Sequence, residues 1–196
     1  MREVELKGVV EAPDAARRAI QAAGAQLVFA GRLEDRRYDT AERTLAARDH
    51  VLRLRVYRAA ETRARLEFKG PTTYVEGYKV REEHSTDGGD PEELARILGL
   101  LGYVVTREID REIEQYTFAG ATVRFERYPR MDVLAEVEGE PAAIDHAIRV
   151  MGIARERFTT ERLPDFVRAY EERTGLRAAI CDRELAGDYP YSATDA

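Results

Sequence analysis

Cysteine is almost missing from this chain of 196 residues, in which Cys181 is the only one. A single cysteine excludes an internal disulfide and any metal site built from several thiolates. No apolar run approaches the roughly 18 residues of a membrane-spanning helix, and the opening residues MREVELK lack the apolar core of a secretory signal. We therefore expect a cytoplasmic protein with no membrane partner. Glycine-rich phosphate loops and a nucleophile elbow are also lacking, so the enzyme classes built on them are not supported.

Lysine is scarce as well. Of the 31 basic residues only Lys7, Lys69 and Lys79 are lysines, and the rest are arginines. The net charge of −6 argues against a general binder of nucleic acid but leaves room for a local basic site. Because an ammonium is a compact point charge and a guanidinium a planar fork, the few lysines indicate where a compact cation is needed.

Secondary structure is predicted from hydrophobic periodicity and from proline and glycine at segment ends. The predicted strands are 1–8, 26–40, 51–57, 62–70, 78–85, 104–118, 121–128 and 133–140, and the predicted helices lie within 13–23, 90–102, 141–151 and 163–175. We expect one α+β domain over residues 1–178, followed by a C-terminal tail over 179–196.

Charged residues occupy alternate positions on most of these strands, so each strand has one charged and one largely apolar face. The charged sets are Glu3/Glu5/Lys7, Arg53/Arg55, Arg65/Glu67/Lys69, Lys79/Arg81/Glu83, Arg124/Glu126 and Glu136/Glu138. An open sheet with a wet charged face is the ordinary explanation. The mixture of both signs, and the presence of all three lysines, instead favour an inward charged face.

Closing about eight strands into a barrel leaves an interior for side chains and one small ligand. An interior carrying so many charges cannot be a dry core, because unpaired buried charge is costly. Lysine and arginine suit phosphate oxygens, and glutamate suits a hard divalent cation. A metal-bound polyphosphate would need both kinds of group at once.

Six short motifs follow one another along residues 1 to 175. They are Glu3-x-Glu5-x-Lys7, RRYDT at 36–40, LRLR at 52–55, FKGP at 68–71, KVREEH at 79–84 and LAEVEGE at 134–140. Together they resemble the CYTH superfamily of triphosphate tunnel metalloenzymes, and most of all its class IV adenylate cyclase (CyaB-like) branch. The resemblance implies an eight-stranded antiparallel β-barrel tunnel with helices packed outside, often in a homodimer.

The resemblance also implies roles for individual residues. Divalent metal, Mg²⁺ or Mn²⁺, would be held by Glu3, Glu5, Glu136 and Glu138. The phosphates would be bound by Lys7, Arg53, Arg55, Lys69, Arg81 and Arg111, with Lys79 and Arg124 on the same charged faces. Besides Lys7, the catalytic candidates are Glu83 and Glu126, either of which could be the general base unless metal hydroxide serves. Two departures from the family pattern are Glu126, where many relatives have aspartate, and Ile109, where relatives often have lysine.

Three functions remain open from the sequence. A class IV adenylate cyclase would convert ATP to cyclic AMP and pyrophosphate. A triphosphatase would release orthophosphate from tripolyphosphate, thiamine triphosphate or a nucleoside triphosphate. A non-catalytic module would only bind polyphosphate, but it would gain nothing from the glutamates, since carboxylates repel phosphate unless metal lies between them. The acidic set therefore favours a metal-dependent enzyme.

Overall fold

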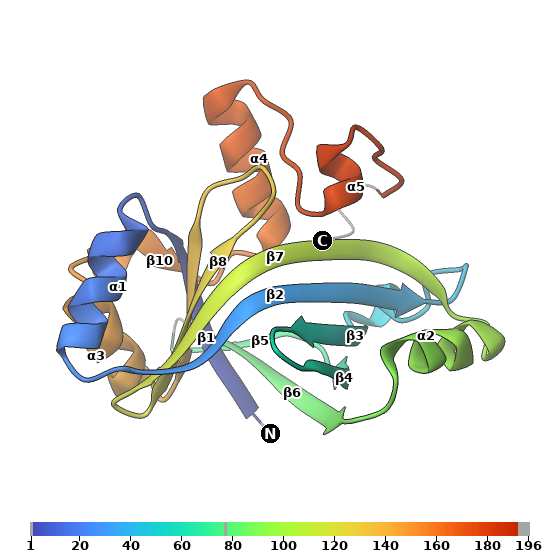
Figure 1. The fold of residues 1–196 in the computed structure, drawn as a ribbon, viewed down its shortest axis with the longest axis horizontal. Helices are drawn as coiled ribbons and strands as arrows, with labels where there is room; N and C mark the ends of the chain where they lie inside the picture. Colours follow the sequence, from blue (N-terminus) through green and yellow to red (C-terminus); the bar gives the residue numbers. More distant parts are fainter. Residues whose placement is uncertain (1, 77, 192–196) are drawn as a thin grey trace.

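The computed structural model describes residues 2–76 and 78–191 (Figure 1). Its strands are β1 (Arg2–Val9), β2 (Gln26–Asp39), β3 (Val51–Arg58), β4 (Thr62–Lys69), β5 (Thr73–Val75), β6 (Tyr78–Asp87), β7 (Val104–Phe118), β8 (Ala121–Arg127), β9 (Leu134–Gly139) and β10 (Phe158–Thr159). Its helices are α1 (Pro13–Ala22), α2 (Pro91–Leu100), α3 (Pro141–Val150), α4 (Leu163–Thr174) and α5 (Asp182–Leu185), with short 3-10 turns η1 (Ala46–Arg48) and η2 (Arg155–Arg157).

Eight of these strands form a closed antiparallel ring. The sheet order is β10-β1-β9-β8-β7-β2-β3-β4-β6-β5, and β1 also pairs with β6, which joins the two ends of the eight inner strands. The short strands β5 and β10 lie outside this ring as additions to β6 and β1. The predicted α+β fold, with eight antiparallel strands closed on themselves and helices outside, is confirmed.

On β1, β3, β8 and β9 the apolar side chains point outward and pack under helices, which lie outside the ring (Figure 1). Helices α1 and α3 pack on β1, β8 and β9, where Ile20, Val123 and Ile144 are fully buried. Helix α2 packs its Leu98 against Leu54 of β3. Each of the helices α1, α2 and α3 begins with a proline at its first position, as the sequence predicts.

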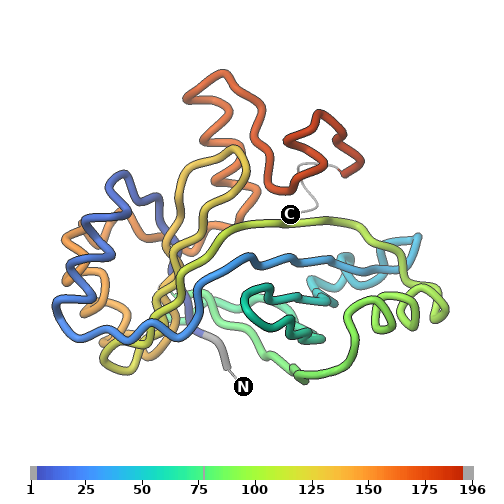
Figure 2. The backbone as a smooth tube through the Cα atoms, viewed as in Figure 1, coloured from blue at the N-terminus to red at the C-terminus, as the bar shows by residue number. Residues whose placement is uncertain are grey.

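The described part of the predicted C-terminal tail packs against the ring. Strand β8 pairs with β7 only as far as Arg127 opposite Glu112, so the earlier half of β7 has no β8 neighbour. The chain from residue 178 lies beside this half of β7 (Figure 2), and the Asp110 amide donates a 2.8 Å hydrogen bond to the Ile180 carbonyl. Ile180 is fully buried, so this segment is part of the ring wall rather than an appendage.

The domain boundary at residue 178 stays a prediction. Within the described residues, none of the helices combines the length and the apolar character that crossing a membrane would require.

Candidate functional site

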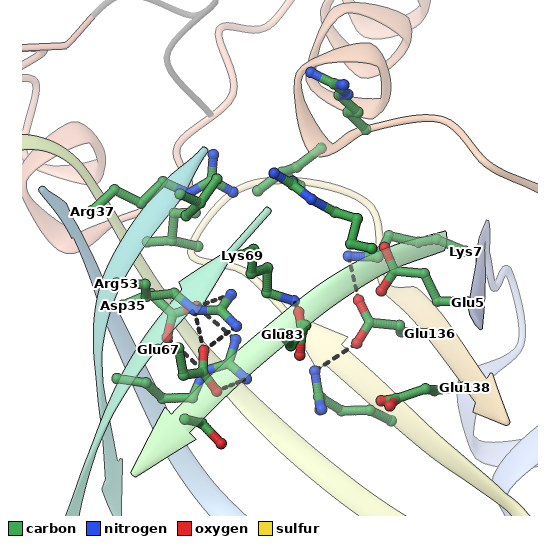
Figure 3. Close-up of a pocket in the computed structure, with 18 of the residues that line it drawn as sticks. Glu5, Lys7, Asp35, Arg37, Arg53, Glu67, Lys69, Glu83, Glu136 and Glu138 are labelled. Atoms are coloured by element: carbon green, nitrogen blue, oxygen red, sulfur yellow. Dashed lines mark hydrogen bonds and ion pairs between the residues drawn. The ribbon is translucent and has the colours of Figure 1, made fainter. Parts of the chain in front are cut away.

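The inward faces of the ring enclose a cavity of about 530 Å³, here called the ring cavity (Figure 3). Its lining is dominated by charge, with eleven cations and eight carboxylates. The cations are Lys7, Arg37, Arg53, Arg55, Arg65, Lys69, Lys79, Arg81, Arg111, Arg124 and Arg162. The carboxylates are Glu5, Asp35, Asp49, Glu67, Glu83, Glu136, Glu138 and Glu161. A protein that is negative overall thus has a cavity with more positive than negative groups, which suits an anionic ligand.

Each of the three lysines faces the ring cavity and forms an ion pair with a glutamate. These lysine pairs are Lys7–Glu136, Lys69–Glu83 and Lys79–Glu5. The Lys7 ammonium lies 2.8 Å from Glu136 and 3.4 Å from Glu126. Burial alone lowers the pKa of Lys7, but the charges of Glu126 and Glu136 outweigh burial and raise that pKa, so Lys7 is a cation at neutral pH.

A second group of ion pairs, here called the arginine cluster, consists of Arg53, Arg55 and Arg111 around Asp35 and Glu67. Arg55 binds Asp35 through two nitrogens at 2.7 and 2.9 Å, and Arg111 adds a contact of 3.1 Å. Asp35 is only 1% exposed. Burial raises the pKa of its carboxyl, but the guanidinium groups of Arg55, Arg53 and Arg111 prevail and hold it well below the usual range. The same competition between burial and the Arg53 and Arg55 charges lowers the pKa of Glu67 to about 2.

Glu126, one of the two predicted general bases, is fully buried behind the cavity lining. Its carboxylate accepts hydrogen bonds from Arg111 at 3.0 Å and from the Tyr128 hydroxyl at 2.7 Å. Burial raises the pKa of Glu126, yet the charges of Lys7 and Arg111 outweigh it and lower the pKa below its usual range. A carboxylate with so low a pKa is a weak base at neutral pH, so this geometry argues against Glu126 as the base.

The predicted metal ligands lie on the neighbouring strands β1 and β9. Glu5 is directly opposite Glu138 in the register of the two strands, and Lys7 is opposite Glu136. The side chain of Glu3 lies outside the described residues. In residues 2–76 and 78–191, no three His, Cys, Asp or Glu side chains are already grouped to hold a metal ion. The donor chemistry fits a hard cation, because adjacent glutamates supply oxygens and phosphate oxygens would complete the coordination.

At one edge of the ring cavity, Arg162 at the start of α4 reaches across to a loop. Its guanidinium lies 3.2 Å from the Asp49 carboxylate and donates a 3.2 Å hydrogen bond to the Thr72 hydroxyl. Arg81 supports the same loop, since its Nε donates to the Gly70 carbonyl at 2.7 Å and its Nη2 to the Asp49 carbonyl at 2.5 Å. Arg162 and Asp49 are therefore part of the site as well.

Most residues predicted for the site meet in the ring cavity. Those that line it are Glu5, Lys7, Arg53, Arg55, Lys69, Lys79, Arg81, Glu83, Arg111, Arg124, Glu136 and Glu138. Ile109 also lines it, so an apolar side chain faces the ligand space at that position. The sequence alone indicates no role for Asp35, Arg37, Asp49 or Arg162, which also line the cavity. Position in the cavity does not test the role of a residue, so the catalytic, phosphate-binding and metal-binding assignments stay predictions.

The CYTH domain family model matches residues 1–147 of this chain. A Pyrococcus horikoshii protein has the same fold with a TM-score of 0.68 and 17% identity, over 84% of this chain and 98% of its own. A candidate adenylate cyclase from Vibrio parahaemolyticus gives 0.71 and 19%, over 85% and 97%. A Hippeastrum protein described as a candidate adenylyl cyclase with a dominant triphosphatase activity gives 0.53 and 16%, over 96% of both chains. No curated protein sequence matches the chain.

Proposed function

This chain belongs to the CYTH domain family, whose members are enzymes that act on triphosphates, and from that premise we propose that it is a metal-dependent enzyme that cleaves a triphosphate in the ring cavity. One observation carries the proposal, which is that eleven cations and eight carboxylates face the same enclosed space. The cations match the charge of a triphosphate. The carboxylates would repel it unless a divalent cation lay between them, and that favours an enzyme over a simple polyphosphate-binding module.

The cations bind and orient the substrate in this proposal. Arg53 and Arg55 are held by Asp35 and Glu67, so their remaining N–H groups are presented to the cavity without rearrangement. Lys7 and Lys69 supply point charges to the phosphate oxygens. Preorganised donors of this kind are effective because the cost of ordering them is met on folding, before the ligand binds.

Glu5 and Glu138 are the proposed principal metal ligands, and Glu3 and Glu136 are the further proposed ligands. A bound Mg²⁺ or Mn²⁺ would neutralise phosphate charge and polarise the phosphoryl group under attack. In the structure Glu5 pairs with Lys79, and Glu136 pairs with Lys7 and Arg124. Metal binding would therefore draw Glu5 away from Lys79, leaving that ammonium for a phosphate oxygen.

The class IV adenylate cyclase reaction is the first candidate. The ribose 3′-hydroxyl would attack the α-phosphorus of ATP, its proton would pass to a base, and the bond to pyrophosphate would break. Glu83 is the better of the two predicted bases, because it lines the cavity whereas Glu126 is buried behind the lining and has a lowered pKa.

A triphosphatase is the second candidate, in which water attacks the terminal phosphorus and orthophosphate is released. The paucity of apolar groups in the cavity favours it, since Val51, Tyr57, Ile109, Tyr128 and Leu163 are the only apolar or aromatic residues in the described lining. A nucleobase would find little surface there on which to stack.

Phosphorus NMR of the purified protein tests the proposal. The protein would be incubated with Mg²⁺ or Mn²⁺ and, separately, with ATP, thiamine triphosphate and tripolyphosphate. Pyrophosphate together with cyclic AMP from ATP would establish the cyclase, and orthophosphate would establish the triphosphatase. If no substrate is turned over with either metal, the catalytic proposal fails and the ring cavity is a binding site.

A further inference from the structure

Arg37 is a cation of the ring cavity for which the sequence alone predicts no role. It lies on β2 directly opposite Arg53 of β3. Figure 3 shows Arg37 and Arg53 on the side of the cavity away from Glu5 and Glu138. Its position is therefore remote from the proposed metal ligands.

The Arg37 guanidinium lacks the carboxylate partners that its neighbours have. Within the described residues, its Nε is buried without a hydrogen-bond partner, and none of the carboxylates there forms an ion pair with it. Arg53, on the adjacent strand, has both Glu67 and Asp35. A buried donor without a partner is costly, so it is retained where something outside the fold repays the cost.

The surroundings of Arg37 have an excess of positive charge. The pKa of Arg37 is lowered to about 10, mainly by burial. The positive charge of Arg53 lowers this pKa further, and the opposing attraction of Asp35 is weaker than that repulsion. Arg37 is still protonated at neutral pH. Asp35, the carboxylate whose charge attracts Arg37, already binds the arginine cluster, and Asp49 binds Arg162. The missing negative charge must then come from a ligand.

We propose that Arg37 binds the phosphate group of the substrate that lies farthest from Glu5 and Glu138, and so selects for a chain of three phosphates over two. This inference rests on the proposed triphosphate substrate. It orients the ligand along the cavity, with one end at the carboxylates of β1 and β9 and the other at Arg37. Arg37 is thus a specificity residue and no part of the base or the metal site.

If Arg37 had only a structural role, its substitution would affect the stability of the protein and not the binding of the anion. If it supported the fold, Arg37→Met would lower the stability of the protein without ligand. If it is kept for a ligand, removing an unpaired buried charge leaves that stability unchanged or raises it. Urea unfolding of the two proteins without ligand separates these cases, and a stability loss in Arg37→Met without a binding defect would overturn the proposal.

Isothermal titration calorimetry with EDTA present measures binding without turnover. Tripolyphosphate and pyrophosphate would be titrated into the wild type, Arg37→Met and a matched control, Arg58→Met, which removes an exposed guanidinium from the neighbouring strand β3. We expect the Kd for tripolyphosphate to rise about 10-fold in Arg37→Met, the size of one charge-assisted hydrogen bond, and the Kd for pyrophosphate to rise less than about 2-fold. Arg58→Met should bind both anions as the wild type does.

Two results would overturn the inference while leaving the proposed function intact. Binding of tripolyphosphate by Arg37→Met with wild-type affinity would show that Arg37 does not touch the ligand. Equal weakening for both anions would show that it does not recognise the third phosphate. If the wild type binds neither anion in EDTA, the same titrations are made with Mg²⁺, and binding of neither anion then means that the proposed function fails together with the inference.

Discussion

The arginine cluster and the lysine pairs hold charge in the same cavity in different ways. In the arginine cluster one carboxylate, Asp35, is bound by three guanidinium groups, and Arg55 and Arg111 each make two hydrogen bonds to it. In the lysine pairs a single ammonium meets a glutamate, as Lys79 meets Glu5. A planar fork fixes a carboxylate in one geometry, whereas an ammonium on a flexible stem can turn to a new partner. We infer that the arginine cluster is the rigid frame of the site and the lysine pairs its exchangeable part.

Breaking the frame should have the largest effect. In Asp35→Asn the guanidinium groups of Arg53, Arg55 and Arg111 lose their shared counter-charge in a place that is almost sealed from water. The free energy of unfolding is expected to fall by about 3–5 kcal/mol, the usual result of removing one partner from a buried ion pair. Urea unfolding followed by circular dichroism would measure it.

Asp14→Asn is the matched control for that substitution. Asp14 pairs with Arg17 at 3.1 Å on the exposed side of α1, so the same change of charge and shape occurs in water. Its effect on the free energy of unfolding should be small, since exposed ion pairs contribute little. Equal losses in Asp14→Asn and Asp35→Asn would mean that the arginine cluster is not a frame.

The frame should also make stability depend on pH in acid. The pKa of Glu67 is about 2 in the folded protein against an ordinary 4.5, because Arg53 and Arg55 outweigh burial. The contribution of Glu67 is complete above pH 4.5 and is lost as the pH falls towards 2, since only the unfolded chain takes up its proton in that interval. This contribution is roughly 3 kcal/mol.

Urea unfolding at a series of pH values between 7 and 2.5 would detect that contribution. In Glu67→Gln the decline of stability below pH 4.5 should be shallower than in the wild type. Glu92→Gln, at an exposed position of α2, should leave the decline unchanged. A decline of the same steepness in Glu67→Gln and the wild type would show that Glu67 does not titrate as the ion pairs imply.

Substitutions in the exchangeable part should remove activity and spare the fold. In Lys7→Ala, Glu126 keeps Arg111 and Tyr128, and Glu136 keeps Arg124. We therefore expect Lys7→Ala and Glu138→Ala to lower the rate of triphosphate cleavage about 100-fold or more, as when one preorganised charge is removed from a transition state. The circular dichroism spectrum should stay that of the wild type. Unfolding of Lys7→Ala would show that its lysine pair belongs to the frame, and unfolding of Glu138→Ala would show that Glu138 supports the fold.

The sequence could predict the exchangeable part better than the frame. On β1 and β9 one face is charged and the other apolar, so alternation puts Lys7 and Glu136 on the charged faces, and the mixture of signs together with the lysines favours an inward direction for those faces. On β2 both faces are charged. Arg36 pairs outward with Asp110 while Asp35 points inward to the arginine cluster, so no alternation marks Asp35 or its neighbour Arg37.

Positions outside the periodic strands could not be predicted for a different reason. Asp49 follows a 3-10 turn and Arg162 precedes α4, and only the folded chain brings them to within 3.2 Å of each other. The segment from residue 179 is predicted to be a tail because its sequence shows no hydrophobic periodicity typical of a helix or a strand. Its burial comes from a gap beside β7, where β8 ends early, and the sequence of that segment alone does not reveal the gap.

Replacing a lysine of the lysine pairs with arginine should have the smallest effect on activity, but it tests directly whether a glutamate exchanges between lysine and metal. Lys79→Arg keeps the charge beside Glu5 but replaces an ammonium with a fork that can bind both carboxylate oxygens. If Glu5 must leave Lys79 to bind metal, the tighter grip should raise the Mg²⁺ concentration for half-maximal activity by about 3-fold, a fraction of the energy of one hydrogen bond, while the maximal rate changes little. An unchanged Mg²⁺ requirement, measured over a full titration, would mean that Glu5 does not exchange between lysine and metal. Arg58→Lys, outside the cavity, should leave the titration as it is, because its partner Glu34 has no part in the site.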